Sequence, residues 1–262
     1  MNNLTILACA FALGAPLLLA QDAKRAPVLP LTEDPVVGLE KLPKGDALMD
    51  KFIEVTGGAE AFKKIKSMEM KGTYEMMGVN ASLTMYRATP NLLLSVIDIP
   101  GMDKMLTGYD GANAWTYSAS MGPAILTGEA ADEIIQEATL DENWRDKYTA
   151  ATTKGTDLVD GAVCYKVELT RKKGAPHTVC FSKDTGLMVK QESVSDTLMG
   201  KMTATSVIKD YRKVGDVTLP FKTVVTQMGQ TVTMTFAEIK VNTDIPKSKF
   251  DPPKEVMELL KR

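Results

Sequence analysis

The sequence has 262 residues, of which 44% are hydrophobic and 24% are charged. Lys and Arg together number 31 and Asp and Glu 33, so the formal net charge is -2. Such a chain lacks the excess of basic residues with which proteins neutralise a phosphate backbone, so a nucleic-acid partner is not expected.

The chain begins with an apolar segment. Residues 4–20 form an apolar run that one glycine and one proline interrupt, and it is short of the ~20 apolar residues that span a membrane as a helix. We therefore predict a signal peptide over residues 1–20, with cleavage near Ala20, and an exported protein. An N-terminal anchor that stays attached is the alternative. Residues 21–44 hold four prolines and little periodicity, which predicts an extended linker.

The next segment carries apolar residues at helical spacing. It predicts a helix over 47–56, with Asp46 as its N-cap and Gly57-Gly58 at its C-terminal end. The other expected helices are 59–65, 128–140 and 253–261.

From Met68 onward the apolar period changes from 3.6 residues to 2. Residues 68–76 alternate strictly between apolar and polar, and residues 79–85 do so in the opposite phase, which predicts a hairpin that turns at Met77-Gly78. Near the end of the chain, the apolar phase flips after Phe236, and such a flip predicts a β-bulge. The expected strands are 68–76, 79–85, 92–99, 113–119, 147–154, 162–171, 177–182, 187–195, 202–212, 217–228 and 231–242.

These elements predict one mainly β domain of α+β type over residues 45–262. About ten or eleven antiparallel strands, joined mainly by hairpins, tend to curl into a barrel or partial barrel. The few helices then have one natural place, over the open face or mouth of the sheet.

Two cysteines remain after the predicted cleavage, Cys164 and Cys180. They lie one on each strand of a predicted hairpin, and the simplest register places Cys180 roughly opposite Val167. That register puts the two thiols on opposite faces of the sheet, beyond the reach of a disulfide. One disulfide and two small buried hydrophobic residues both remain open from the sequence.

The sequence contains none of the common catalytic motifs, and we expect no enzymatic activity. Its single histidine, His177, is expected on the surface and cannot form a histidine-based metal cluster. No Ser-centred elbow, phosphate-binding glycine loop, zinc-protease motif or calcium loop is present. We therefore predict no catalytic residue, no metal and no cofactor.

Methionine is abundant instead. The chain has 16 Met against 2 Trp and 7 Phe, and several of these methionines fall on the apolar faces of the first two predicted strands. Unbranched, polarizable side chains repack around varied guests, which favours an adaptable apolar pocket. A closed core padded with methionine is the alternative that composition alone favours.

Several segments resemble the outer-membrane lipoprotein-sorting (LolA/LolB-like) superfamily. The segment from Gly57-Gly58 through the 68–74 strand is similar to the start of many of its members. Residues 87–92 resemble its R-P-N-L segment, and residues 108–117 resemble its D-G-x-x-x-W-x-Y turn and strand. Similar C-terminal features are Asp184–Leu187, Asp210–Arg212, Leu219–Phe221, Val241-Asn242, Ile245-Pro246 and Phe250.

The resemblance implies a curved antiparallel half-barrel whose helices cover the concave face as a lid. It also implies a periplasmic carrier or binding protein for lipid or lipoprotein acyl chains, with a peripheral membrane contact allowed. In the carriers an arginine directly before the Pro-Asn latches the lid. Here that position is Thr89, while Arg87 lies two residues earlier on the same strand face, so these two residues are the candidates for the lid contact. The alternative is an extracytoplasmic sensor or scaffold that uses the same fold to bind a protein partner.

The strand phases and the resemblance together select the residues expected to line a lipid site. They are Met68, Met70, Tyr74, Met76, Leu83, Met85, Leu92, Leu94, Val96, Trp115, Met234 and Phe236.

Overall fold

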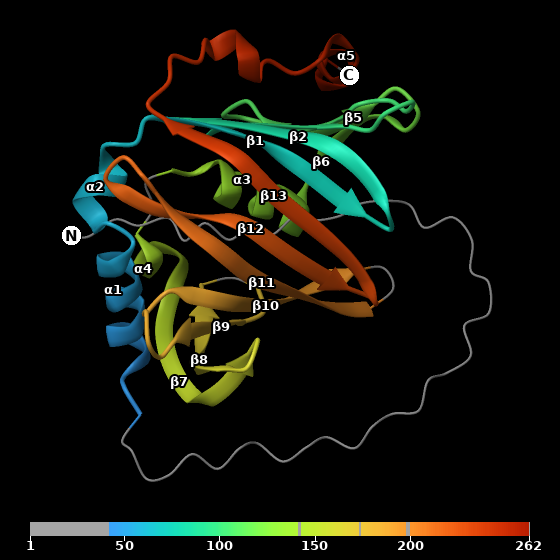
Figure 1. Cartoon of the computed structure of the whole chain (residues 1–262). Helices are drawn as coiled ribbons and strands as arrows, with labels where there is room; N and C mark the ends of the chain where they lie inside the picture. The colour runs from blue at the N-terminus through green and yellow to red at the C-terminus, as the bar shows by residue number, and fades with distance from the viewer. Residues whose placement is uncertain (1–41, 141–142, 173, 198–199, 262) are drawn as a thin grey trace.

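The computed structural model describes residues 42–140, 143–172, 174–197 and 200–261, and one antiparallel sheet dominates it (Figure 1). The predicted signal peptide and the predicted linker as far as residue 41 lie outside the described residues. The strands are β1 (Ser67–Met76), β2 (Val79–Ala88), β3 (Leu92–Asp98), β4 (Met105–Tyr109), β5 (Ala114–Ser118), β6 (Gly122–Leu126), β7 (Tyr148–Val159), β8 (Ala162–Arg171), β9 (His177–Ser182), β10 (Met188–Thr197), β11 (Gly200–Val214), β12 (Val217–Gln227) and β13 (Gln230–Val241).

These thirteen strands of the described chain form a single sheet in the order β6-β5-β4-β3-β2-β1-β13-β12-β11-β10-β9-β8-β7. The chain therefore lays down two meanders, β1 to β6 and β7 to β13, and the pairing of β1 with β13 joins them. The edge strands β6 and β7 do not pair with each other, so the sheet is open. This confirms a mainly β antiparallel architecture, with more strands than the ten or eleven expected.

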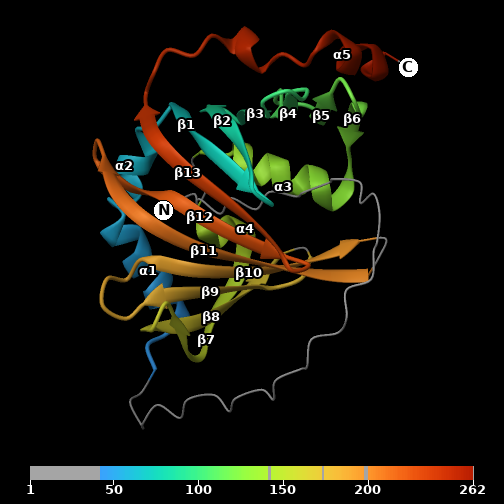
Figure 2. The ribbon, with the colours of Figure 1, turned by 45° about the vertical axis from the view of Figure 1, so that its right-hand side comes forward.

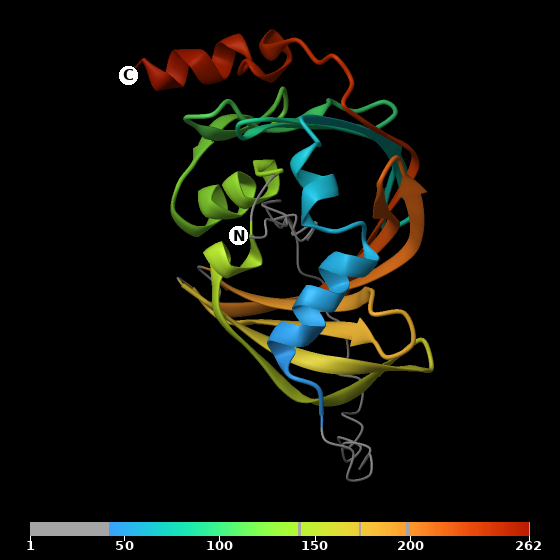
Figure 3. The same cartoon turned by 90° about the vertical axis from the view of Figure 1, so that its left-hand side faces the viewer.

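The helices lie mostly within the curve of the sheet, as Figure 3 shows for α2 and α3. The helix α3 and the short α4 connect β6 to β7, while η1 and α5 run along the outer side of the first meander (Figures 1 and 2). The helical elements are α1 (Gly45–Val55), α2 (Ala59–Lys63), α3 (Gly128–Ala138), α4 (Trp144–Lys147), η1 (Lys247–Phe250) and α5 (Lys254–Leu260).

The strands that the sequence did not predict are β4 and β6. Each has five residues, and β6 includes Gly122 and Pro123, so neither is long enough to display a clear alternation. The start of α1 also differs from the prediction, because its N-cap is Lys44 and Asp46 lies in the first turn. A Cβ on Gly45 would overlap the carbonyl of Ala151, so the helix begins where it packs against β7.

The predicted β-bulge in the last strand is confirmed. Between Lys71 and Gly72 the register of β1 against β13 shifts, and Ala237 becomes the extra residue between Phe236 and Glu238. The bulge lets the apolar positions on both sides of it face the same interior, which a regular strand would prevent.

The two cysteines lie on the same face of the sheet, and the predicted register was wrong by one residue. Cys180 pairs with Lys166 and not with Val167, and Cys164 pairs with Ser182. A slip of one residue moves a side chain to the other face of a strand. Both cysteines are buried and both are free thiols.

Candidate functional site

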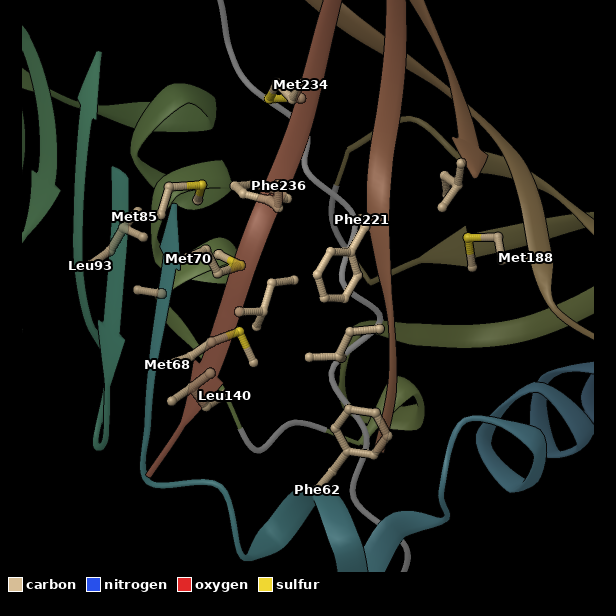
Figure 4. Packing of buried hydrophobic residues seen from close by; sticks show 14 of the residues in the cluster. Phe62, Met68, Met70, Met85, Leu93, Leu140, Met188, Phe221, Met234 and Phe236 are labelled. Carbon is tan, nitrogen blue, oxygen red and sulfur yellow. The ribbon is translucent and has the colours of Figure 1, made fainter. Parts of the chain in front are cut away.

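The concave side of the sheet is lined by methionine and aromatic side chains that form one contiguous buried cluster. Its central strands contribute Met68, Met70, Met85 and Met234, and Met188 joins them from β10; none of these side chains is more than 2% exposed. Figure 4 shows them facing one another, with Phe62 of α2 and Leu140 from the segment after α3 closing the cluster. The helices thus complete an apolar interior that the sheet alone would leave open.

Eight of the twelve residues selected from the sequence belong to this interior. Met76 is partly buried and packs against the cluster. The other seven, all buried in it, are Met68, Met70, Tyr74, Leu83, Met85, Met234 and Phe236.

The other four lie on the opposite, convex face, and their assignment to the inner face was wrong. Leu92, Leu94 and Trp115, with Val96 partly buried beside them, form a second cluster under Phe250 and Val256 of the C-terminal segment. For the three residues of β3 the error arose because this strand is apolar on both faces, so the alternation does not show which face points inward. The residues of β3 that the sequence reasoning missed are Leu93 and Ile97, both part of the concave cluster.

A buried arginine connects the sheet to the end of α3. Arg87 of β2 is 1% exposed and stands opposite Met68 and Leu93 in its two neighbouring strands. Its guanidinium donates a hydrogen bond of 2.8 Å to the carbonyl oxygen of Thr139, the residue that ends α3. Of the two candidates for a lid contact, Arg87 is therefore the one that reaches a covering helix. Thr89 lies in the β2–β3 turn, where its N–H donates to the carbonyl of Lys66.

Titratable groups surround this contact. Glu137, on the last turn of α3, is buried, and the loss of water around it raises its pKa from 4.5 to about 7, although the positive charge of Arg87 acts against the shift. Lys147 ends α4, and its burial together with the charges of Arg87 and Arg171 lowers its pKa to about 7. The side of the interior near α3 and α4 is thus polar, whereas the floor of the sheet is apolar.

His177 belongs to the same polar region, and its predicted place on the surface was wrong. The residue is buried, and its Nδ1 lies 3.1 Å from the hydroxyl of Tyr148. Burial and the positive charges of Arg171 and Lys147 lower the pKa of His177 from 6.5 to about 4. The imidazole is consequently neutral in the folded protein at neutral pH.

This shift predicts a loss of stability in acid. Because the pKa of His177 is lower in the folded chain, the unfolded chain takes up the proton first, and the stability that is present above pH 6.5 is lost as the pH falls toward 4. Between pH 6.5 and pH 4 we expect protonation of His177 in the unfolded chain to lower the free energy of unfolding by roughly 3 kcal/mol. Urea unfolding at several pH values, in the wild type and in His177→Gln, would measure it. Glu137 has the opposite effect on stability, but it is present in both proteins and cancels when their free energies of unfolding are subtracted. If the two free energies change with pH in parallel, His177 is not the source of the loss.

No three His, Cys, Asp or Glu side chains among the described residues gather closely enough to hold a metal ion. Nor is any helix in this part of the chain both long and apolar enough to cross a membrane.

Comparison with known proteins identifies the fold. No protein-family model matches the sequence, and no curated protein matches it. Among solved structures, a DUF1329 family protein from Desulfovibrio piger is similar with a TM-score of 0.57 and 16% identity, over 82% of this chain and 100% of that one.

Two further structures have a TM-score of 0.53. A LolA superfamily protein from Nitrosomonas europaea is 15% identical over 80% of this chain and 99% of that one. A putative outer membrane lipoprotein-sorting protein domain from Vibrio parahaemolyticus is 13% identical over 81% and 99%. At these identities the likeness concerns the fold, and the fold implied by the sequence motifs is confirmed.

Proposed function

We propose that this chain, which shares the fold of LolA superfamily proteins, is an exported carrier or binding protein for the acyl chains of a lipid or lipoprotein. The acyl chain would lie against the methionine-lined concave face, beneath the helices α2 and α3. The observation that carries the proposal is the buried methionine cluster on β1, β2 and β13, in the interior of this half-barrel.

The physical basis of the proposal is the adaptability of these side chains. Methionine has three rotatable bonds and no branch, so a wall of methionines can repack around a guest at a lower cost than a wall of branched residues. Each methylene group that leaves water contributes about 0.8 kcal/mol, and a chain of ten or more such groups therefore binds firmly by burial alone. No catalytic group is needed, and we propose that the protein acts by binding and release without a chemical step.

Entry of a guest requires that the covering helices move. We propose that α3 is the mobile cover and that the hydrogen bond from Arg87 to Thr139 holds it in the closed position. Because Glu137 is buried next to the same end of the helix, lifting α3 would also return this carboxyl group to water.

The proposal is tested by asking whether the protein carries lipid. The protein would be purified from its native host without detergent, and the extract of the folded protein analysed by mass spectrometry. We expect bound lipid or an acylated polypeptide, and we expect an apolar fluorescent dye to be taken up and then displaced by fatty acid. A folded protein that holds no lipid and takes up no dye would contradict the proposal and would favour a sensor or scaffold that binds a protein partner.

The role of Arg87 gives a separate prediction. In Arg87→Lys the charge is kept, but the shorter ammonium side chain cannot reproduce the guanidinium geometry at Thr139. We expect a loss of about 1–3 kcal/mol in the free energy of unfolding and faster hydrogen exchange across α3, together with faster dye entry. The matched control is Arg212→Lys, since Arg212 is exposed and contacts Asp210 and the ring of Phe221. Unchanged exchange in α3 of the Arg87 variant would show that this contact does not hold the helix.

A further inference from the structure

Four exposed methionines lie in turns at one end of the sheet, where the strands reverse direction. In this antiparallel order β1, β3, β5 and β12 run in the same direction, so their C-terminal ends lie at the same end of the sheet. The connections that follow these four strands carry Met77, Met102, Met121 and Met228, which are 75%, 69%, 48% and 56% exposed. We call these four residues the methionine rim. In Figure 1 their turns lie toward the right, at the end of the sheet away from α1 and α2.

Two residues of the rim occupy backbone positions that methionine does not favour. The two-residue turns Met77-Gly78 and Met228-Gly229 have φ values of 52° and 79°, and of 52° and 75°. Turns with positive φ at both central residues favour Asn or Asp at the first position. The β7–β8 turn obeys this rule with Asp160-Gly161 at 51° and 81°.

The rest of the described backbone follows the same rule. Its other non-glycine residues with positive φ are Asp210 and Asn242, so the two methionines are the exceptions within these ranges. A large apolar side chain there lowers neither the backbone energy nor the exposed apolar area. Residues that are unfavourable at their position for both folding and solubility are expected at functional surfaces.

The charged residues near the rim are few and mostly acidic. Glu75 lies two residues before Met77, and Asp103 directly follows Met102; both side chains are exposed. Asp98 and Lys104, which flank the β3–β4 connection, form an ion pair of 3.0 Å with each other. Met228 stands between Gln227 and Gly229, with Gln230 next, and has no charged neighbour in sequence. The rim therefore presents separate apolar tips beside a few acidic groups, without the basic cluster that binds anionic lipid headgroups.

We propose that the methionine rim docks the protein on the surface of a lipid bilayer by shallow insertion of its four tips. The four tips belong to separate turns at one end of a curved sheet. A protein partner would need four matched pockets to contact them, whereas a fluid bilayer can accommodate all four at once. Because the rim has no basic cluster, we expect binding to neutral membranes with little dependence on salt. This inference is independent of the proposed cargo, because it concerns the outer tips and not the interior.

Oxidation of methionine gives a site-resolved test on the full chain. Dilute hydrogen peroxide converts exposed methionine to its sulfoxide, and mass spectrometry of peptides reports the rate at each position. We expect phosphatidylcholine vesicles to slow oxidation of Met77, Met102, Met121 and Met228 at least fivefold. The internal control is Met257 on α5, which is 41% exposed and should be oxidised at an unchanged rate. Equal rates with and without vesicles, or equal protection of Met257, would overturn the proposal.

A pair of substitutions separates docking from stability. Met77→Asn together with Met228→Asn should fold at least as well as the wild type, because Asn suits both turns, and should reduce vesicle protection of Met102 and Met121 at least threefold. The matched control replaces Leu158 and Val163, exposed at 54% and 39% beside the β7–β8 turn, with Asn and should leave protection unchanged. A rim variant that stays fully protected would contradict the proposal, and protection by a soluble protein but not by vesicles would identify a protein partner instead. Bound lipid, measured on the same samples, reports the proposed cargo separately.

Discussion

A Met70→Asp variant is expected to lose lipid uptake and about 3–5 kcal/mol of its free energy of unfolding. Met70 is fully buried in the middle of β1, with Met85 of β2 opposite it on one side and Ile239 of β13 on the other. A carboxylate at this position would be charged without a partner in an apolar interior, or would be protonated at a similar cost. Either form would also place a polar group against the proposed acyl chain. Urea unfolding and lipid analysis by mass spectrometry on the same preparation would measure both effects.

The control for this variant lies on the other face of the sheet. Trp115→Ala removes a side chain that is 1% exposed under the C-terminal segment, and we expect a similar cost of about 3–5 kcal/mol. Its lipid uptake should nevertheless remain, because the convex cluster is outside the proposed site. If Met70→Asp does not fold, Met70→Gln keeps nearly the same volume and should reduce uptake at a smaller cost in stability. Normal uptake by either folded Met70 variant would mean that this wall does not contact the lipid.

The second large effect, a loss of stability, is expected from Gly72→Ala, although this substitution adds only one methyl group. A Cβ at Gly72 would overlap the carbonyl oxygen of Thr235 and would press on the Cα of Phe236, and both of these obstacles are backbone atoms. This is the bulge at which β1 pairs with β13 and at which the two meanders join. We expect a loss of about 3 kcal/mol, because the strands must separate to admit the group.

The neighbouring residue provides the comparison for Gly72. Thr73→Ala changes an exposed position of the same strand without adding volume, and we expect it to cost less than 1 kcal/mol. Thermal and urea unfolding of the two variants would measure the difference. If both proteins unfold at the same urea concentration, the close approach at the bulge does not contribute to stability.

The strand pattern was the part of the fold that the sequence predicted well, and the reason is that its signal is local. In β1 and β2 the apolar and polar residues alternate along one strand, so the inner positions Met70 and Met85 follow from a period of 2. The bulge after Phe236 was predicted in the same way, as a change of phase within one strand. The short strands β4 and β6 were missed because five residues carry too little of this signal, whereas the equally short β5 was marked by the Asp110-Gly111 turn before it.

The wrong predictions concern which face is covered and by what. Trp115 was assigned to the interior because it is apolar and follows a family-like turn, but the C-terminal segment covers the convex face and buries it there. Similarly, Cys180 was placed one residue out of register, since the register of β8 and β9 depends on how their connection closes and not on either strand alone. Both errors come from contacts between segments that are distant in the chain or joined by an irregular loop.

The sequence by itself determined the described strands other than β4 and β6, the inner faces of β1, β2 and β13, and the abundance of methionine there, because periodicity and composition are local properties of each segment. Only the tertiary structure decided that Arg87 reaches Thr139 at the end of α3, that His177 is buried against Tyr148, and that four exposed methionines lie at one end of the sheet. These facts depend on the order of the strands and on the path of the chain from β6 to β7. Such long-range pairing follows from the packing of the whole chain, and no local pattern encodes it.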